Sequence, residues 1–147
     1  MISAARLLPV AAKRPGILIT HWVPEEVIDR LLAGCDLIVN ASRDTWERDR
    51  VLDLARRCEG MIAFMPDRID EVFLSRCPRL SVIAFAVAHV ENCDFDACTR
   101  HGVWVTCAAG ARNGAAMEAA ETVLDVLAGR RPRGAANEPA HASRSLE

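Results

Sequence analysis

The sequence predicts an α/β protein of three layers, in which helices cover both faces of a parallel β-sheet. Short runs of β-branched and apolar residues alternate with segments that repeat apolar residues at helical spacing, and this alternation is typical of β–α–β crossover units. Five such runs occur between residues 16 and 107. Most are nearly all apolar, as strands covered on both faces should be. Together these observations predict a five-stranded, all-parallel sheet.

The first two strand–helix units occupy residues 16–55. The run Gly16–His21 predicts a strand, and Pro24 fits the first position of a helix, followed by two glutamates that favour the positive end of the helix dipole. A second strand is predicted at Asp36–Val39. Asp44 and Glu47 have the spacing of a capping box, which predicts that the second helix starts there.

Three further strands complete the predicted sheet, at Gly60–Met65, Leu80–Val87 and Val103–Cys107. A last helix is expected at Arg112–Ala128, because small and apolar residues recur there at helical spacing. Right-handed crossovers leave few arrangements for such a chain. We therefore predict a flavodoxin-like three-layer α/β/α fold with strand order 2-1-3-4-5, in which the last helix packs beside the first.

Acidic and amide side chains mark the starts of the third and fourth helices. Asp67, Asp70 and Glu71 precede or open the third helix, where capping and dipole complementarity explain them without catalysis. Asn92 or Asp94 is expected to cap the fourth helix. None of these residues is predicted to act chemically.

The chain is expected to form one folded domain between two loose ends. Residues 1–15 lack the apolar core of a secretory signal and predict a disordered leader, and residues 16–130 form the domain. From residue 131 to 147 the composition turns to Arg, Pro, Gly, Ala, Asn and Ser, which predicts a flexible tail. The final Leu146 and Glu147 resemble a cloning remnant.

Composition argues against several classes of function. The net charge is −2 with a pI near 6.1 and no basic stripe, which argues against nucleic-acid binding. The longest apolar runs are too short to span a membrane. Six cysteines contain no CxxC pair and four histidines contain no HExxH motif, so we expect reduced thiols, a cytoplasmic protein and no metal site.

Four segments together carry a family resemblance. The sequences I-T-H (Ile19–His21), A-F-M-P-D-R (Ala63–Arg68) and D-A-C-T-R-H-G-V-W-V-T (Asp96–Thr106) resemble phosphite (phosphonate) dehydrogenase, a member of the D-2-hydroxyacid dehydrogenase superfamily. Residues 112–132 are similar to that family's final helix. The resemblance implies an NAD-dependent oxidoreductase as the parent enzyme.

The resemblance also implies that a nucleotide-binding domain is lacking. Relatives carry it between the segments that match residues 16–107 and 111–128, whereas here only Ala108–Ala111 lies near that point. The family's catalytic Arg, Glu and His have no matching position, and no GxGxxG motif follows any predicted strand. We therefore expect a truncated or engineered substrate-binding domain with no catalytic residue, no cofactor and no activity alone.

The resemblance places the substrate-binding residues of this domain at Met65, Val87, Ala88 and His89. Ala88 stands where phosphite dehydrogenase has a lysine, and His89 stands where it has a glycine. Both changes predict weak binding of a small anion. For His89 two interpretations stay open: it supplies a partial positive charge to the ligand, or it is an ordinary surface-loop histidine. For Met65 the two are a contact with the substrate and an ordinary residue at the rim of the sheet.

Other interpretations stay open at this point. One alternative is a stand-alone binding module for a small anion, a phosphate-like ligand or a flavin. Another is half of an enzyme that needs a separate NAD domain. A homodimer would use the exposed interdomain surface or exchange the terminal helix. His21 ends the first strand beside the site and is expected to cap a helix or to line the rim.

Overall fold

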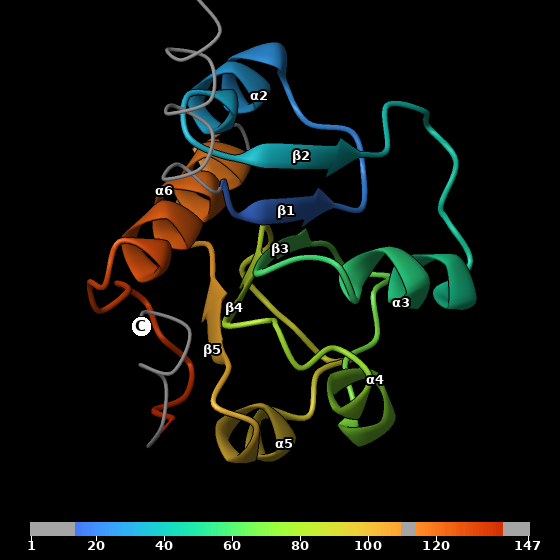
Figure 1. Cartoon of the computed structure of the whole chain (residues 1–147), viewed down its shortest axis with the longest axis vertical. Helices are drawn as coiled ribbons and strands as arrows, with labels where there is room; N and C mark the ends of the chain where they lie inside the picture. Colours follow the sequence, from blue (N-terminus) through green and yellow to red (C-terminus); the bar gives the residue numbers. More distant parts are fainter. Residues whose placement is uncertain (1–13, 110–113, 140–147) are drawn as a thin grey trace, which may run out of the picture.

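The computed structural model describes residues 14–109 and 114–139, and a five-stranded parallel sheet runs through its centre (Figure 1). The strand order is β2-β1-β3-β4-β5, and every neighbouring pair is parallel. The predicted topology is therefore confirmed. The strands are β1 (Gly16–Ile19), β2 (Asp36–Val39), β3 (Gly60–Ala63), β4 (Val82–Phe85) and β5 (Trp104–Cys107).

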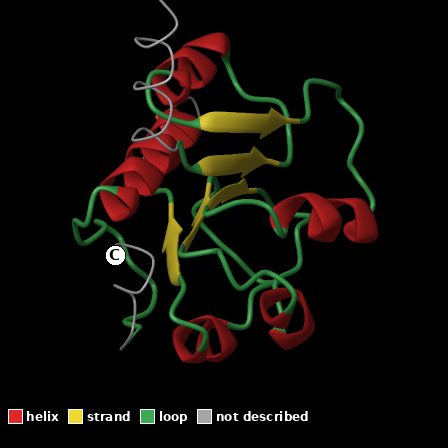
Figure 2. Ribbon diagram, in the orientation of Figure 1, coloured by secondary structure: helices red, strands yellow, loops and turns green. Residues whose placement is uncertain are grey.

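Helices cover both faces of the sheet, which confirms the three layers (Figure 2). Helices α2 and α6 pack on one face, and α3, α4 and α5 pack on the other. The contact between α2 and α6 also confirms that the last helix lies beside the first. The helices are α2 (Glu25–Leu32), α3 (Arg48–Ala55), α4 (Glu71–Ser75), α5 (Phe95–Arg100) and α6 (Ala115–Leu127).

Two apolar cores hold the layers together, one on each face of the sheet. Along β1, Ile17 and Ile19 enter the core under α2 and α6, whereas Leu18 between them enters the core under α3, α4 and α5. All three side chains are fully buried. This alternation explains why the strand sequence is apolar throughout, because each face of a central strand meets a helical layer.

Two predicted helix caps, Asp70 and Asp94, are confirmed, and each bonds to an amide three residues further along the chain. Asp70 accepts a hydrogen bond from the Phe73 amide at 3.0 Å, and Asp94 accepts one from the Ala97 amide at 3.0 Å. The capping box at the start of α3 is wrong. Glu47 is the residue before that helix and makes no side-chain cap.

The segment after α6 differs from the flexible tail expected from residue 131. The Ala136 amide donates to the Val105 carbonyl at 2.7 Å. The Asn137 side chain accepts from the Val105 amide at 2.9 Å and donates to the Val103 carbonyl at 2.8 Å. Residues 135–137 therefore follow the outer edge of β5, and a polar side chain supplies the order that the composition did not predict.

The remaining expected features fall into two groups. Residues 1–13 of the expected leader, the junction at residues 110–113 and the end of the tail from residue 140 lie outside the described residues. Arg14, the first described residue, donates a hydrogen bond to Asp36 at 2.9 Å. Within residues 14–109 and 114–139, no helix is both long and apolar enough to cross a membrane, and no group of side chains has the composition of a metal site. All six cysteines are free thiols.

Candidate functional site

The candidate site lies where β1 and β3 end. After β1 the chain enters α2 on one face of the sheet, and after β3 it enters α4 on the opposite face. In a sheet of order 2-1-3-4-5, this divergence opens a crevice at the carboxyl ends of the two strands, which is where such folds bind ligands. His21 follows β1, and Phe64 and Met65 follow β3.

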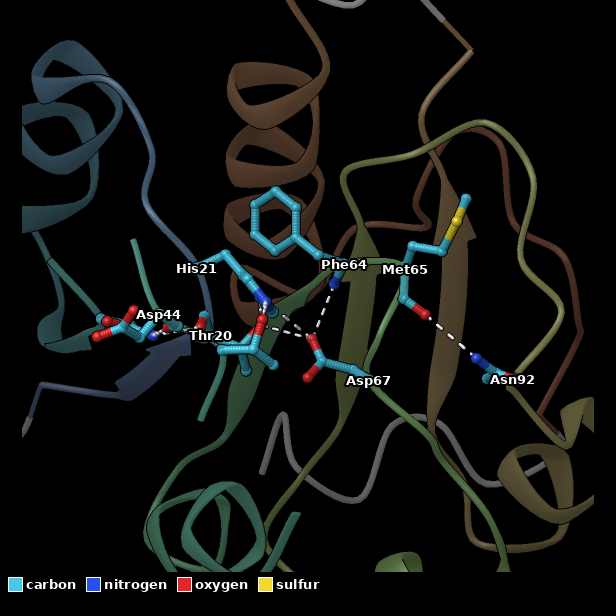
Figure 3. A network of polar contacts seen from close by, with 9 residues as sticks. Thr20, His21, Asp44, Phe64, Met65, Asp67 and Asn92 are labelled. Atoms are coloured by element: carbon cyan, nitrogen blue, oxygen red, sulfur yellow. Dashed lines mark hydrogen bonds and ion pairs between the residues drawn. The ribbon is translucent and has the colours of Figure 1, made fainter. Parts of the chain in front are cut away.

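A buried carboxylate joins the two strand ends. Asp67 is 7% exposed, and its Oδ2 accepts a hydrogen bond from the hydroxyl of Thr20, which is fully buried, at 2.5 Å. The same oxygen accepts the Phe64 amide at 2.9 Å. In Figure 3 dashed lines join the Asp67 carboxylate to both donors. The bond from Thr20 connects the end of β1 to the turn that follows β3.

Burial raises the pKa of Asp67 above its ordinary value. The hydrogen bonds from Thr20 and Phe64, and the nearby His21, oppose this increase because they favour the charged form. The sequence-based explanation of Asp67 as a helix-start residue is therefore wrong. Asp70 caps the helix, whereas Asp67 contacts a strand end 47 positions away in the sequence.

The Thr20 hydroxyl determines which nitrogen of His21 carries the proton. Its single hydrogen is donated to Asp67, so the contact of 3.1 Å between its oxygen and His21 Nδ1 requires a proton on Nδ1. In the neutral ring the other nitrogen, Nε2, is then an acceptor, and the Thr45 hydroxyl lies 3.4 Å from it. His21 is thus oriented by a chain of hydrogen bonds that ends at a buried carboxylate.

A buried asparagine brings the end of β2 into the same network. Asn40 is 1% exposed, and its amide donates to the Thr20 carbonyl at 3.1 Å and to the Asp44 carbonyl at 2.8 Å. Its side-chain oxygen accepts the amide and the hydroxyl of Ser42. The ends of β1, β2 and β3 are therefore fixed relative to one another.

The predicted site residues are found on the same edge of the sheet, in two groups. Met65 is 60% exposed, and its side chain points away from Asp67 (Figure 3). Asn92 donates to the Met65 carbonyl at 3.2 Å, which places the end of the loop after β4 beside the turn after β3. Val87 is half-buried, and Ala88 is exposed.

His89 is exposed and lies against an acidic neighbour. Its Nε2 is 3.4 Å from a carboxylate oxygen of Glu91. The negative charge of Glu91 beside His89 disfavours an anionic ligand at this point of the loop.

Backbone N–H groups of the loop after β4 have no acceptor among the described residues. Within the described part of the chain, no acceptor bonds to the backbone N–H groups of residues 87–90. Consecutive unpaired N–H groups form an anion-binding surface in many proteins.

The cavity beside Asp67 is too small for an organic ligand. It measures about 60 Å³ and lies between α3 and the turn after β3, with Trp46, Arg48 and Phe73 among its walls. Ligand pockets are usually hundreds of cubic ångströms in volume. A ligand at the strand ends would thus need a second surface to enclose it.

Sequence reasoning found the strand ends but missed two residues of the network, Thr20 and Asn40. Each is a single polar residue that directly follows an apolar strand. A polar residue directly after an apolar strand is the feature of the sequence that could have indicated the network, because a buried polar side chain needs a hydrogen-bond partner.

Comparison with known protein families matches most of the domain. The model of the family described as D-isomer specific 2-hydroxyacid dehydrogenase, catalytic domain, matches residues 17–118. The glyoxylate reductase of Thermofilum pendens is 28% identical over 95 residues, and that of Aeropyrum pernix is 31% identical over 94 residues. These alignments cover 63% and 64% of this chain but only 28% of each relative.

Solved structures give the same fold. A protein of Pyrococcus horikoshii OT3 superposes with a TM-score of 0.60 at 22% identity, over 67% of this chain and 28% of that one. The 3-phosphoglycerate dehydrogenase of Entamoeba histolytica, solved with bound NAD⁺, has a TM-score of 0.55 at 20% identity, over 65% and 33%. The chain thus corresponds to about a third or less of these proteins.

The raised pKa of Asp67 leads to a prediction for acid stability. The folded state binds the Asp67 proton more tightly than the unfolded state does. The contribution of this carboxyl to the free energy of unfolding is therefore greatest at low pH. It is lost as the pH rises from about 3.9, the ordinary pKa of aspartate, through the raised pKa. Asp67→Asn removes this loss. Urea unfolding of both proteins should therefore show the variant gaining stability relative to wild type across that interval.

The difference in unfolding free energy between Asp67→Asn and wild type should stop growing once the pH exceeds the raised pKa of Asp67. Asp53→Asn, on the exposed face of α3, serves as a control and should show no such trend. A relative stability of Asp67→Asn that falls as the pH rises would contradict a raised pKa.

Proposed function

Because this chain belongs to the D-isomer specific 2-hydroxyacid dehydrogenase catalytic-domain family, we propose that it is the substrate-side domain of a dehydrogenase of that family. The match over residues 17–118 carries the proposal. The network of hydrogen bonds at the strand ends supports it, since it rigidifies the edge at which an α/β sheet binds ligands.

The nucleotide cofactor of such a dehydrogenase does not fit the residues of this chain. The loop after β1 reads His21-Trp22-Val23-Pro24, with no glycine to let a backbone approach a pyrophosphate. No strand is followed by the GxGxxG motif. Hydride transfer needs a nicotinamide aligned with the substrate and an acid or base beside it. We therefore propose that this chain alone is inactive and that another domain or chain supplies the nucleotide.

The proposed ligand is a small anion, such as a 2-hydroxy acid, a 2-oxo acid or phosphite. The unpaired N–H groups of residues 87–90 would receive it, and Met65 would line the apolar side. Binding would be weak, because Ala88 provides no charge and His89 lies beside the acidic side chain of Glu91. A relative's name, glyoxylate reductase, is consistent with this class of ligand.

The same edge exposes apolar side chains that a partner would cover. Trp22 is 47% exposed and Met65 is 60% exposed. A partner packed against this edge would remove these two side chains from water. We propose that a nucleotide domain covers this edge, or a second copy of the chain where no such domain is present.

Turnover measurements test the catalytic part of the proposal. The purified chain, mixed with glyoxylate and NADH or with phosphite and NAD⁺, should show no change in NADH absorbance above the background without protein. Addition of the separately produced nucleotide domain of a glyoxylate reductase would distinguish a half-enzyme from a domain that has lost its function. Turnover by this chain alone would show that the proposal is incorrect.

A lysine at position 88 should increase anion affinity. In Ala88→Lys, an ammonium would stand next to the unpaired N–H groups, and one charged hydrogen bond gives about a tenfold lower Kd. The measurement is a titration with phosphite, followed by the NMR shifts of the amides of residues 87–90.

Ala33→Lys is the matched control, because it adds the same charge after α2 at the opposite edge of the sheet. Its Kd should equal that of wild type. Equal affinities of wild type and Ala88→Lys would place the anion elsewhere.

A further inference from the structure

Two cysteine thiols meet at the start of α5. The sulfur atoms of Cys93 and Cys98 are 3.8 Å apart and within hydrogen-bonding reach of each other. Asp94 between them is the N-cap of the helix. Cys93 therefore precedes the N-cap and Cys98 is the fourth residue of the helix, the two positions whose side chains pack together in a hydrophobic staple. Here both members of the staple are oxidisable.

The backbone on both sides holds the two sulfurs in place. Cys98 is fully buried in the core under α3, α4 and α5. Cys93 lies in a short bridge to Ile69, in which the Ile69 amide donates to the Asn92 carbonyl at 2.8 Å and the Asp94 amide donates to the Ile69 carbonyl at 2.9 Å. A disulfide bond of about 2.05 Å needs a closer approach of the sulfurs than this contact.

From this geometry we propose that Cys93 and Cys98 are an oxidative modification site, which reacts with a small-molecule disulfide and closes into an intramolecular disulfide bond. The Cys93 thiolate attacks one sulfur of the small disulfide, and its S–S bond breaks to release one thiolate. The Cys98 thiolate then attacks the Cys93 sulfur of this mixed disulfide and displaces the second small thiolate. The two cysteines lose two electrons and two protons, and the small disulfide becomes two thiols.

The order of the two attacks follows from exposure. Cys93 is half-buried and Cys98 fully buried, so the first bond forms at Cys93. The hydrogen bond with Cys98, together with burial, raises the pKa of the Cys93 thiol. The thiolate is scarce at neutral pH for this reason, and the reaction is slow there and faster at alkaline pH.

Cys107 is the competing partner for Cys93. It ends β5 and is half-buried. Burial, and to a lesser extent Cys93, raises the pKa of its thiol. Unlike Cys98, it does not occupy the staple position of α5. The proposal therefore requires Cys93 to pair with Cys98 and not with Cys107.

Peptide mapping after oxidation tests the proposal on the unmodified full chain. The folded protein is incubated with oxidised glutathione at mildly alkaline pH, alkylated and digested with trypsin. Cleavage after arginine leaves Cys93 and Cys98 together in residues 80–100 and Cys107 in residues 101–112. We expect the first peptide to lose two hydrogens and to accept no alkyl group, and dithiothreitol to reverse both changes.

Two variants serve as controls. Cys93→Ala should abolish the internal bond, whereas Cys58→Ala, which alters a buried cysteine of the same core, should leave it intact. Three results would overturn the proposal: two alkylated cysteines in residues 80–100 of the oxidised wild type, a cross-link to residues 101–112, or an internal bond that forms only in denaturant. The first measurement needs no variant, so a variant that fails to fold does not affect the test.

Discussion

The hydrogen bond from Thr20 to the buried carboxylate of Asp67 is the interaction on which the candidate site depends. It joins the ends of two neighbouring strands, β1 and β3, whose chains then leave toward opposite faces of the sheet. A buried carboxylate is costly unless donors satisfy it. Thr20 and the Phe64 amide satisfy this one. The same bond uses the only hydroxyl proton of Thr20 and thereby sets the proton position on His21.

The sequence predicted the parts of the structure that depend on local patterns. Five apolar runs gave the strands, and the caps Asp70 and Asp94 could be located because each contacts an amide three residues away. Asp67 could not be assigned from such a pattern, since its partner Thr20 is 47 positions distant. Asn137 escaped prediction for a related reason, because its side chain bonds to Val105 and Val103, more than 30 positions away in the sequence. Contacts between distant polar residues leave little trace in local composition.

Three features meet at this edge of the sheet. The network of Thr20, Asp67 and Asn40 makes the strand ends rigid, and the loop after β4 offers unpaired N–H groups. Asn92 links that loop to Met65, and the thiol pair of α5 lies directly after it in the chain. These features suit a domain that contributes one wall of a ligand site. Under the proposed function a partner would supply the second wall, since the cavity beside Asp67 measures only about 60 Å³.

The nitrogen-15 NMR spectrum of the His21 imidazole tests the central claim most directly, at a pH where the ring is neutral. A proton on Nδ1 and a bare Nε2 are the result that the hydrogen bonds from His21 through Thr20 to Asp67 require. In Thr20→Val this preference should be lost, because the relay atom is removed, while Thr45→Val should keep it. A wild-type ring protonated on Nε2 would contradict the claim that the buried carboxylate orients His21.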